Sequence, residues 1–258
     1  PGDLAIVACN DGTDAFGVLA LVDIPAGATF HVTDYGWLAA GGFSAGGSNE
    51  GTVSYTAPTA IPKGTVLKWA TGASAPWSET SGFNFASGGD QLIIFQGTVP
   101  ASGVPVADHL VYALQSRNGW SSDATSSGTS SEPTSAHGGN LVSGVTAVTV
   151  PGNESGYYSG PLSGTREYLL GEIAKTANWT AGAGDYANTL WAAAFTFTAK
   201  ITPTIGFGLT PTSVAYGQSI TLAATTSSDG TIVYSLVSGS GASLAGNQLM
   251  ATSGTGSV

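Results

Sequence analysis

Residues 9–37, CNDGTDAFGVLALVDIPAGATFHVTDYGW, contain two apolar runs bounded by residues that favour turns. The run at 16–23 is apolar almost throughout, whereas the later run alternates and places Phe30 and Val32 on one face. A repeat of two residues is typical of a strand with one buried face. The Asp-Gly pair at 11–12 favours a tight turn between strands. Cys9 ends a further apolar run at 4–9, so this stretch predicts the first three strands of a β-sandwich, with Asp11 and Asp14 in the first turn.

The same pattern continues along most of the chain, where short apolar runs end at Gly, Pro, Asn or Asp. In QLIIFQG, residues 91–97, the apolar residues follow one another without a break, which predicts a strand covered on both faces. The predicted strands are 4–9, 16–23, 29–34, 52–56, 65–70, 91–96, 108–114, 145–150 and 192–199. We therefore expect an all-β protein.

One segment predicts a helix, TREYLLGEIAKTANW at 165–179. Its apolar residues follow helical spacing, Thr165 is suited to cap the first turn, and Glu167 lies within that turn. The polar segment 115–144 is long for a loop, and such loops are usually functional or disordered.

The pattern changes at 199–218, AKITPTIGFGLTPTSVAYGQ, which contains two prolines. Three further strands are predicted at 219–226, 231–239 and 247–254. We expect residues 201–258 to form a second, smaller β domain. It is well below the roughly 100 residues of an immunoglobulin domain, so we expect it to be incomplete, either cut short or completed by another chain.

The charge of the chain excludes some partners. Sixteen acidic residues against six basic residues give a formal charge of −10, and only 9% of residues are charged. An acidic chain is not expected to bind nucleic acid or an anionic membrane surface, and it is compatible with divalent cations. No apolar run reaches the ~18 residues that span a bilayer, so we expect no membrane insertion. A chain with so few charges is also suited to assembly.

The sequence contains no catalytic motif that we regard as specific. Residues 42–46, GFSAG, match the nucleophile elbow G-x-S-x-G, but no helical pattern follows the serine, as that elbow requires. Cys9 is the only cysteine and is predicted to be a core residue. The histidines are too far apart for a metal motif, at His31, His109 and His137. Four acids in predicted loops are expected to be solvated rather than paired as in a glycosidase, Glu50, Glu79, Glu132 and Glu154.

The acids of the first turn are candidates for a calcium site, because calcium prefers six to eight oxygen ligands that often cluster on a loop. The candidate ligands are Asn10, Asp11, Asp14 and Asp34. Asp3 or Asp90 would complete the site if the sheet brought them together. The alternative is that Asp11 and Gly12 simply make the turn between two strands. Calcium is the one candidate cofactor.

Aromatic residues in or beside predicted loops are candidates for contact with a ligand or another subunit, because an exposed ring can stack on a sugar or fill a partner's pocket. These residues are Trp37, Trp77, Trp120, Tyr157 and Tyr158. The alternative is that they pack against the sheets.

Three motifs carry a family resemblance, GDLAIVACND at 2–11, PKGTVLKW at 62–69 and SGGDQLIIFQG at 87–97. Together they resemble an N-terminal β domain of large secreted bacterial surface proteins, and their order resembles lamin-tail-like domains. The tail at 234–258, YSLVSGSGASLAGNQLMATSGTGSV, is similar to bacterial immunoglobulin-like repeats. The resemblance implies an immunoglobulin-like β-sandwich with one short helix at 1–200, followed by a partial immunoglobulin-like domain at 201–258. It transfers no catalytic residues.

These observations favour a non-catalytic extracellular protein of the bacterial cell surface, acting in adhesion or as a self-assembling fibre or sheath subunit. Its expected partners are other copies of itself or other surface proteins. The alternative is a carbohydrate-binding module of a secreted multidomain protein, with a glycan as partner. A hydrolase with dispersed loop residues is the least favoured hypothesis.

Overall fold

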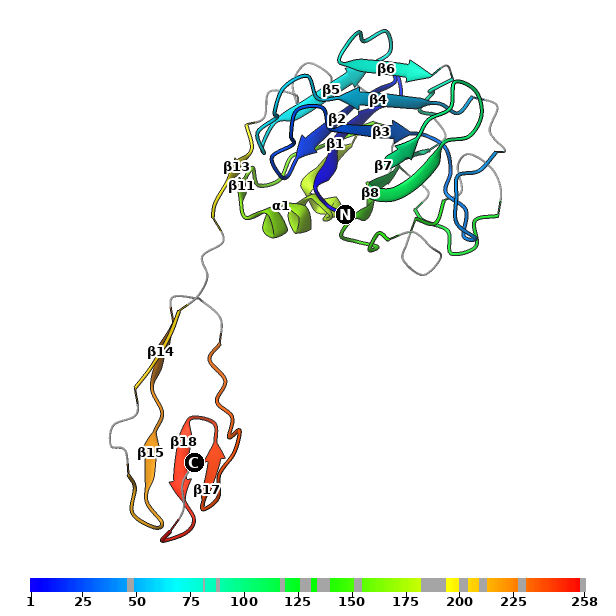
Figure 1. Ribbon diagram of the computed structural model, residues 1–258. Coiled ribbons are helices and arrows are strands. Elements are labelled where there is room, and N and C mark those ends of the chain that lie inside the picture. Colours follow the sequence, from blue (N-terminus) through cyan, green and yellow to red (C-terminus); the bar gives the residue numbers. More distant parts are fainter. Residues whose placement is uncertain are drawn as a thin grey trace. The chain divides into compact units, whose positions relative to one another are not determined.

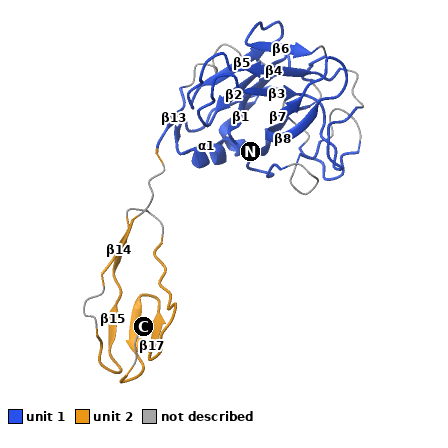
Figure 2. Ribbon diagram, in the orientation of Figure 1, with its two compact units in different colours: residues 1–198 blue, residues 199–258 orange. Residues whose placement is uncertain are grey.

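The structure is a computed structural model, and the chain divides in it into two compact units, 1–198 and 199–258 (Figure 2). The division lies two residues before the domain boundary expected at 200. The residues that the structure describes are 1–45, 49–80, 82–86, 89–116, 119–125, 131–133, 140–150, 155–181, 194–199, 204–208, 213–226 and 231–255.

Unit 1 is a sandwich of two sheets, so the predicted all-β sandwich is confirmed (Figure 1). The first sheet is antiparallel, with the order β12 (Trp179–Ala181), β10 (Gly156–Tyr158), β1 (Leu4–Asn10), β2 (Ala15–Ala20) and β5 (Val66–Ala70). The second has the order β6 (Trp77–Thr80), β4 (Thr52–Thr56), β3 (Thr29–Thr33), β7 (Gln91–Thr98), β8 (Val106–Ser116) and β9 (Ala147–Val150). In this sheet β8 and β9 are parallel, and the other neighbours are antiparallel.

The main core lies between the two sheets and is rich in aromatic rings. Phe16 of β2 stacks on Trp69 of β5 with ring centroids 5.1 Å apart, and it meets the edge of Trp77 from the opposite sheet at 5.7 Å. Aromatic pairs of this kind add about 0.5–1.5 kcal/mol beyond the burial of their area. Rings from both sheets therefore join the two layers at one point.

A second apolar cluster covers the outer face of the six-stranded sheet. Ile93 and Phe95 of β7 face it, and Trp37, Phe43 and Leu141 pack over them from the connecting segments. The ring centroids of Phe43 and Phe95 are 5.0 Å apart. The prediction that this strand is covered on both faces is confirmed.

The predicted helix is confirmed at its start and wrong at its end. α1 (Arg166–Ile173) is capped by Thr165, whose side chain accepts a hydrogen bond from the Tyr168 amide at 3.1 Å. The chain then forms a 3₁₀ turn, η2 (Thr176–Asn178), and Trp179 begins a strand. The Trp179 indole donates to the Ile173 carbonyl at 2.7 Å, so a buried tertiary contact ends the helix early.

The sequence pattern did not predict several short strands. β6 and β10 were not predicted because β6 contains two exposed polar residues and β10 has only three residues. β11 (Ser163–Gly164), just before the predicted helix, was also not predicted; it pairs in parallel with β13 (Thr196–Phe197), which lies within the predicted strand 192–199. The beginning of the predicted strand 192–199 lies outside the described residues.

Unit 2 has only short ladders. β14 (Ile205–Phe207) pairs with β16 (Ala224–Thr226), and β18 (Gln248–Ala251) lies between β15 (Ser219–Thr221) and β17 (Ala242–Ala245). The predicted strand 219–226 is thus split into two strands with different partners. The prediction of a strand at 231–239 is wrong, because no ladder includes these residues. Among the described residues of both units, no helix has the length and apolar character needed to cross a membrane.

Candidate functional site

Four acids from four different elements meet at one end of the sandwich, and we call them the acidic cluster. They are Asp14, Asp34, Glu50 and Asp90. Asp34 follows β3, Glu50 precedes β4 and Asp90 precedes β7. Because β4, β3 and β7 are antiparallel neighbours, the end of β3 lies beside the beginnings of the other two. Asp14 comes from the turn between β1 and β2 in the other sheet.

The cluster binds the backbone of one short segment, residues 82–86. The amides of three consecutive residues donate to three different carboxylates: Asn84 to Asp34 at 2.7 Å, Phe85 to Asp14 at 2.9 Å and Ala86 to Asp90 at 2.9 Å. This arrangement fixes the segment, and it places the rings of Phe83 and Phe85 in the main core.

The neighbouring backbone completes these contacts. The second oxygen of Asp34 accepts from the Gly51 amide at 2.6 Å, and the second oxygen of Asp90 accepts from the Gln91 amide at 2.8 Å. Gly51 also allows the segment to approach, since a Cβ at this position would lie 2.1 Å from the Phe83 nitrogen. Asp14 has φ of 44°, a left-handed conformation that Asp tolerates in turns.

Burial keeps these acids protonated at unusually high pH. It raises the pKa of Asp34 to about 9, of Asp90 to about 8 and of Glu50 to about 7. Backbone hydrogen bonds lower the pKa values of Asp34 and Asp90, and the neighbouring acids of the cluster raise them. Burial also raises the pKa of Asp14. Burial thus raises the pKa values of all four carboxyls of the cluster.

The predicted calcium ligands and the two acids named to complete the site lie in three places. Asp14 and Asp34 belong to the acidic cluster together with Asp90, whereas Asp3 forms an ion pair with Arg166 at 2.7 Å. Asn10 accepts from the Thr13 amide at 3.2 Å, and Asp11 bonds to the Ser155 hydroxyl. The turn proposed as the alternative at 11–14 is present. Among the described residues, no three His, Cys, Asp or Glu side chains are grouped so as to hold a metal, and calcium binding stays a prediction.

Three of the five candidate contact aromatics are buried, in agreement with the alternative that they pack against the sheets. Trp77 and Tyr158 belong to the main core, and Trp37 belongs to the outer cluster. The physical reason is that the segments expected to be open loops fold back on the sheets: the Trp37 amide donates to the Ser131 hydroxyl at 2.9 Å. Trp120 and Tyr157 are half-buried.

The remaining candidate catalytic residues are the histidines, the serine of the GFSAG match and the four acids of the predicted loops. His31 lies 2.8 Å from the Ser54 hydroxyl, and burial lowers its pKa. Ser44 of the GFSAG match is buried. The expectation of solvated loop acids is wrong for Glu132, which is buried, and for Glu50, which is half-buried. Glu79 lies on β6, and its pKa is raised by burial and by the Asp14 carboxylate. His109 is exposed, and His137 and Glu154 lie outside the described residues.

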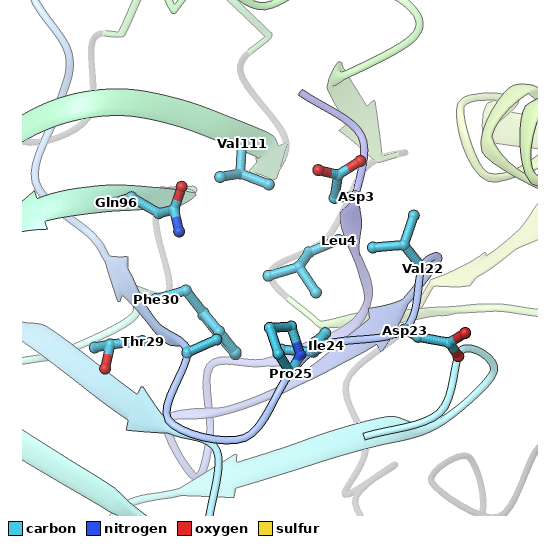
Figure 3. A pocket seen from close by; sticks show the side chains of 11 residues that line it. Asp3, Leu4, Val22, Asp23, Ile24, Pro25, Thr29, Phe30, Gln96 and Val111 are labelled. Carbon is cyan, nitrogen blue, oxygen red and sulfur yellow. The ribbon is translucent and has the colours of Figure 1, made fainter. Parts of the chain in front are cut away.

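A pocket of about 290 Å³ opens between the sheets where β1 begins (Figure 3). Leu4, Ile24, Phe30 and Val111 give it an apolar lining. Val111 reaches it because β8 has a bulge there, which re-aims a side chain. The volume is just below the roughly 300–1,000 Å³ of ligand pockets. The pocket is therefore sized for an aliphatic group.

Polar residues at the edge of this pocket are tied to the fold. Asp3 is paired with Arg166, and Asp23 accepts from the Lys63 amide at 2.8 Å. Sequence patterns could not reveal the pocket, because it depends on a bulge and on which strands pair.

Comparisons with known proteins add no family to this description. No family model, no curated protein and no solved structure matches the chain. The functional argument therefore depends on the residues of the chain itself.

Proposed function

We propose that the protein is a non-catalytic cell-surface module, and that unit 2 associates with other copies or with other surface proteins. The observation that carries the proposal is the apolar surface of unit 2. Its large exposed apolar residues are Ile205, Phe207, Tyr216, Val233, Leu236, Val237 and Met250. Exposed apolar groups gathered on one small unit are typical of interaction surfaces.

The distribution of charge supports the same proposal. Lys200 and Asp229 are the only charged residues from 199 to 258, so this part has no net charge. The first 198 residues hold the other 15 acids and five bases and carry the whole net charge of −10. Charges at sheet edges normally prevent association, and large like charges repel. Unit 2 lacks this protection, whereas contacts between two copies of unit 1 are opposed.

The acidic cluster supports a structural role for the ionisable groups of unit 1. Its carboxylates accept hydrogen bonds from backbone amides, and these bonds hold the segment 82–86. The resemblance to secreted bacterial surface proteins supports an extracellular location. In this proposal unit 1 is a stable sandwich, and unit 2 makes the adhesive or assembling contact.

Sedimentation velocity of the full chain over a range of concentrations tests the proposal, with electron microscopy of the same samples. We expect association that increases with concentration and that persists at high salt, because apolar contacts are not screened. Association that disappears in high salt would assign it to charge and contradict the role of unit 2. A monomer at all concentrations, with no binding to a bacterial surface, would refute the proposal.

A further inference from the structure

The segment 231–239, TIVYSLVSG, has the composition of a strand but no strand partner. Its first seven residues are mostly β-branched, aromatic or aliphatic, and such residues favour strands. Burial alternates at its start: Ile232 and Tyr234 are half-buried, whereas Val233 is 84% exposed. Further along, Val237 is 93% exposed. The segment therefore shows one face to its own unit and one face to solvent.

The side chain of Tyr234 attaches this segment to unit 2. Its hydroxyl accepts from the Ala224 amide at 2.8 Å, and its ring centroid lies 6.1 Å from that of Phe207. Within the described part of the chain, no backbone hydrogen bond involves residues 231–239. The structure thus holds an extended segment whose backbone donors and acceptors are open to a partner.

A hollow adjoins the start of this segment. It has a volume of about 590 Å³, and Ile232, Val233 and Tyr234 line it together with Leu244 and Asn247. In Figure 1 the chain before β17 runs without a strand arrow. An unpaired, apolar, extended segment is a template for strand addition.

We propose that residues 231–239 form an edge for β-strand addition and that the occupant is the same segment of a second copy, paired antiparallel. This inference rests on the proposed function and names its contact. Two copies of one segment related by a two-fold axis run antiparallel and form a closed, self-complementary interface. Pairing satisfies the open backbone groups and covers Val233 and Val237.

The charge distribution selects this occupant. The described residues of unit 2 include no charged side chain, so two such segments approach without repulsion. Unit 1 carries the whole net charge of −10, so association of two copies through unit 1 is opposed. The segment itself is neutral and strand-forming, which are the two properties that the edge requires.

Lysines placed on the edge test the proposal in the full chain. The double variant Val233→Lys, Val237→Lys brings like charges together across the pair, and we expect the dissociation constant to increase about tenfold or more. The matched control is Ser213→Lys, Gln218→Lys, which adds the same charge at two exposed polar positions elsewhere in unit 2 and leaves its exposed apolar residues unchanged. We expect the control to associate as the unchanged protein does, measured by sedimentation equilibrium.

The outcomes separate this inference from the proposed function. If the unchanged chain associates and the edge variant associates equally well, the inference is refuted and the proposed function stands. If the unchanged chain stays monomeric throughout, the inference is refuted, and the proposed function is refuted as well only if the chain also fails to bind a bacterial surface. Loss of association in the edge variant alone supports both.

A spin label at position 235 gives a second measurement that needs no loss of association. Cys9 is buried, so a thiol introduced by Ser235→Cys is labelled selectively. Paired strands lie about 4.8 Å apart, so two labels near the two-fold axis should lie within about 10 Å of each other. At this distance the electron paramagnetic resonance spectrum of the label should broaden strongly. The control label is Val106→Cys in unit 1. An associated sample without broadening at position 235 would overturn the inference.

Discussion

Both units contain segments whose residues favour strands, but the two units differ in how far those segments pair with neighbouring strands. In unit 1 the inner strands of both sheets pair on two sides, and their apolar side chains meet in one core. In unit 2 the ladders have three or four residues, and 231–239 joins none of them. The comparison shows that a strand depends on what lies beside it as much as on its own residues.

The largest expected effect is on the free energy of unfolding. It is found by truncating one apolar residue of each unit to alanine. Phe16 is fully buried among aromatic rings, and Phe16→Ala should lower the free energy of unfolding of unit 1 by about 3–5 kcal/mol. Val233→Ala removes an exposed side chain, and below the concentration at which the chain associates it should change stability by less than about 0.5 kcal/mol.

Denaturant titration distinguishes the two units in this experiment. All six tryptophans lie in the first 198 residues, so their fluorescence reports on unit 1 alone, and circular dichroism reports on both units. A destabilisation by Val233→Ala as large as that by Phe16→Ala would break the comparison.

The next effect concerns the acidic cluster. Asp34→Ala removes the acceptor of the Gly51 and Asn84 amides, and each buried donor left unpaired costs about 1–3 kcal/mol. We expect a total loss of roughly 2–4 kcal/mol, because two amides lose their acceptor. Asp108→Ala is the control, because Asp108 is exposed on β8. Equal stability of the two variants in thermal unfolding would refute the anchoring role of Asp34.

The pH dependence follows from the raised pKa values. Unfolded Asp and Glu titrate near pH 4, whereas Asp34, Asp90 and Glu50 titrate at about 9, 8 and 7 in the folded protein. Between these limits the folded state binds more protons than the unfolded state. The free energy of unfolding therefore decreases as pH rises from about 4 to about 9.

Tryptophan-detected unfolding at a series of pH values measures this trend in unit 1. Asp90→Asn removes one titrating group and should flatten the decline. A stability that is constant or that increases with pH over this range would contradict the buried, protonated state of the cluster.

Calcium is expected to have the smallest effect. Asp14 and Asp34 would have to exchange amide hydrogen bonds for the ion, so any calcium stabilisation in unit 1 should stay below about 1 kcal/mol at concentrations near the dissociation constant. Thermal unfolding with calcium and with a chelator measures it, and Asp14→Ala is the control. Equal midpoints in the unchanged protein would remove calcium from the description.

Much of the first sandwich could be predicted from the sequence, because long apolar runs such as 91–97 require burial whatever lies beside them. The acidic cluster could be predicted only in part. Asp14 and Asp34 stood out near turns, but the contributions of Glu50 and Asp90 depend on which strand ends the sheet brings together. The burial of Trp37 could not be predicted, because it results from loops that fold back on the outer face of the second sheet. The failed prediction at 231–239 has the opposite cause, since its residues favour a strand and none of the described residues of its unit pairs with it.

The position of β1 has a consequence for how the protein is made. β1 is an inner strand of its sheet, and its neighbours are β2, which follows at once, and β10, which begins at Gly156. A ribosome adds roughly 5–20 residues per second, so one edge of β1 stays open for on the order of ten seconds during synthesis. Arg166, which bonds to the Gly2 carbonyl and to Asp3, arrives later still. The nascent chain therefore exposes one edge of β1 until β10 has emerged.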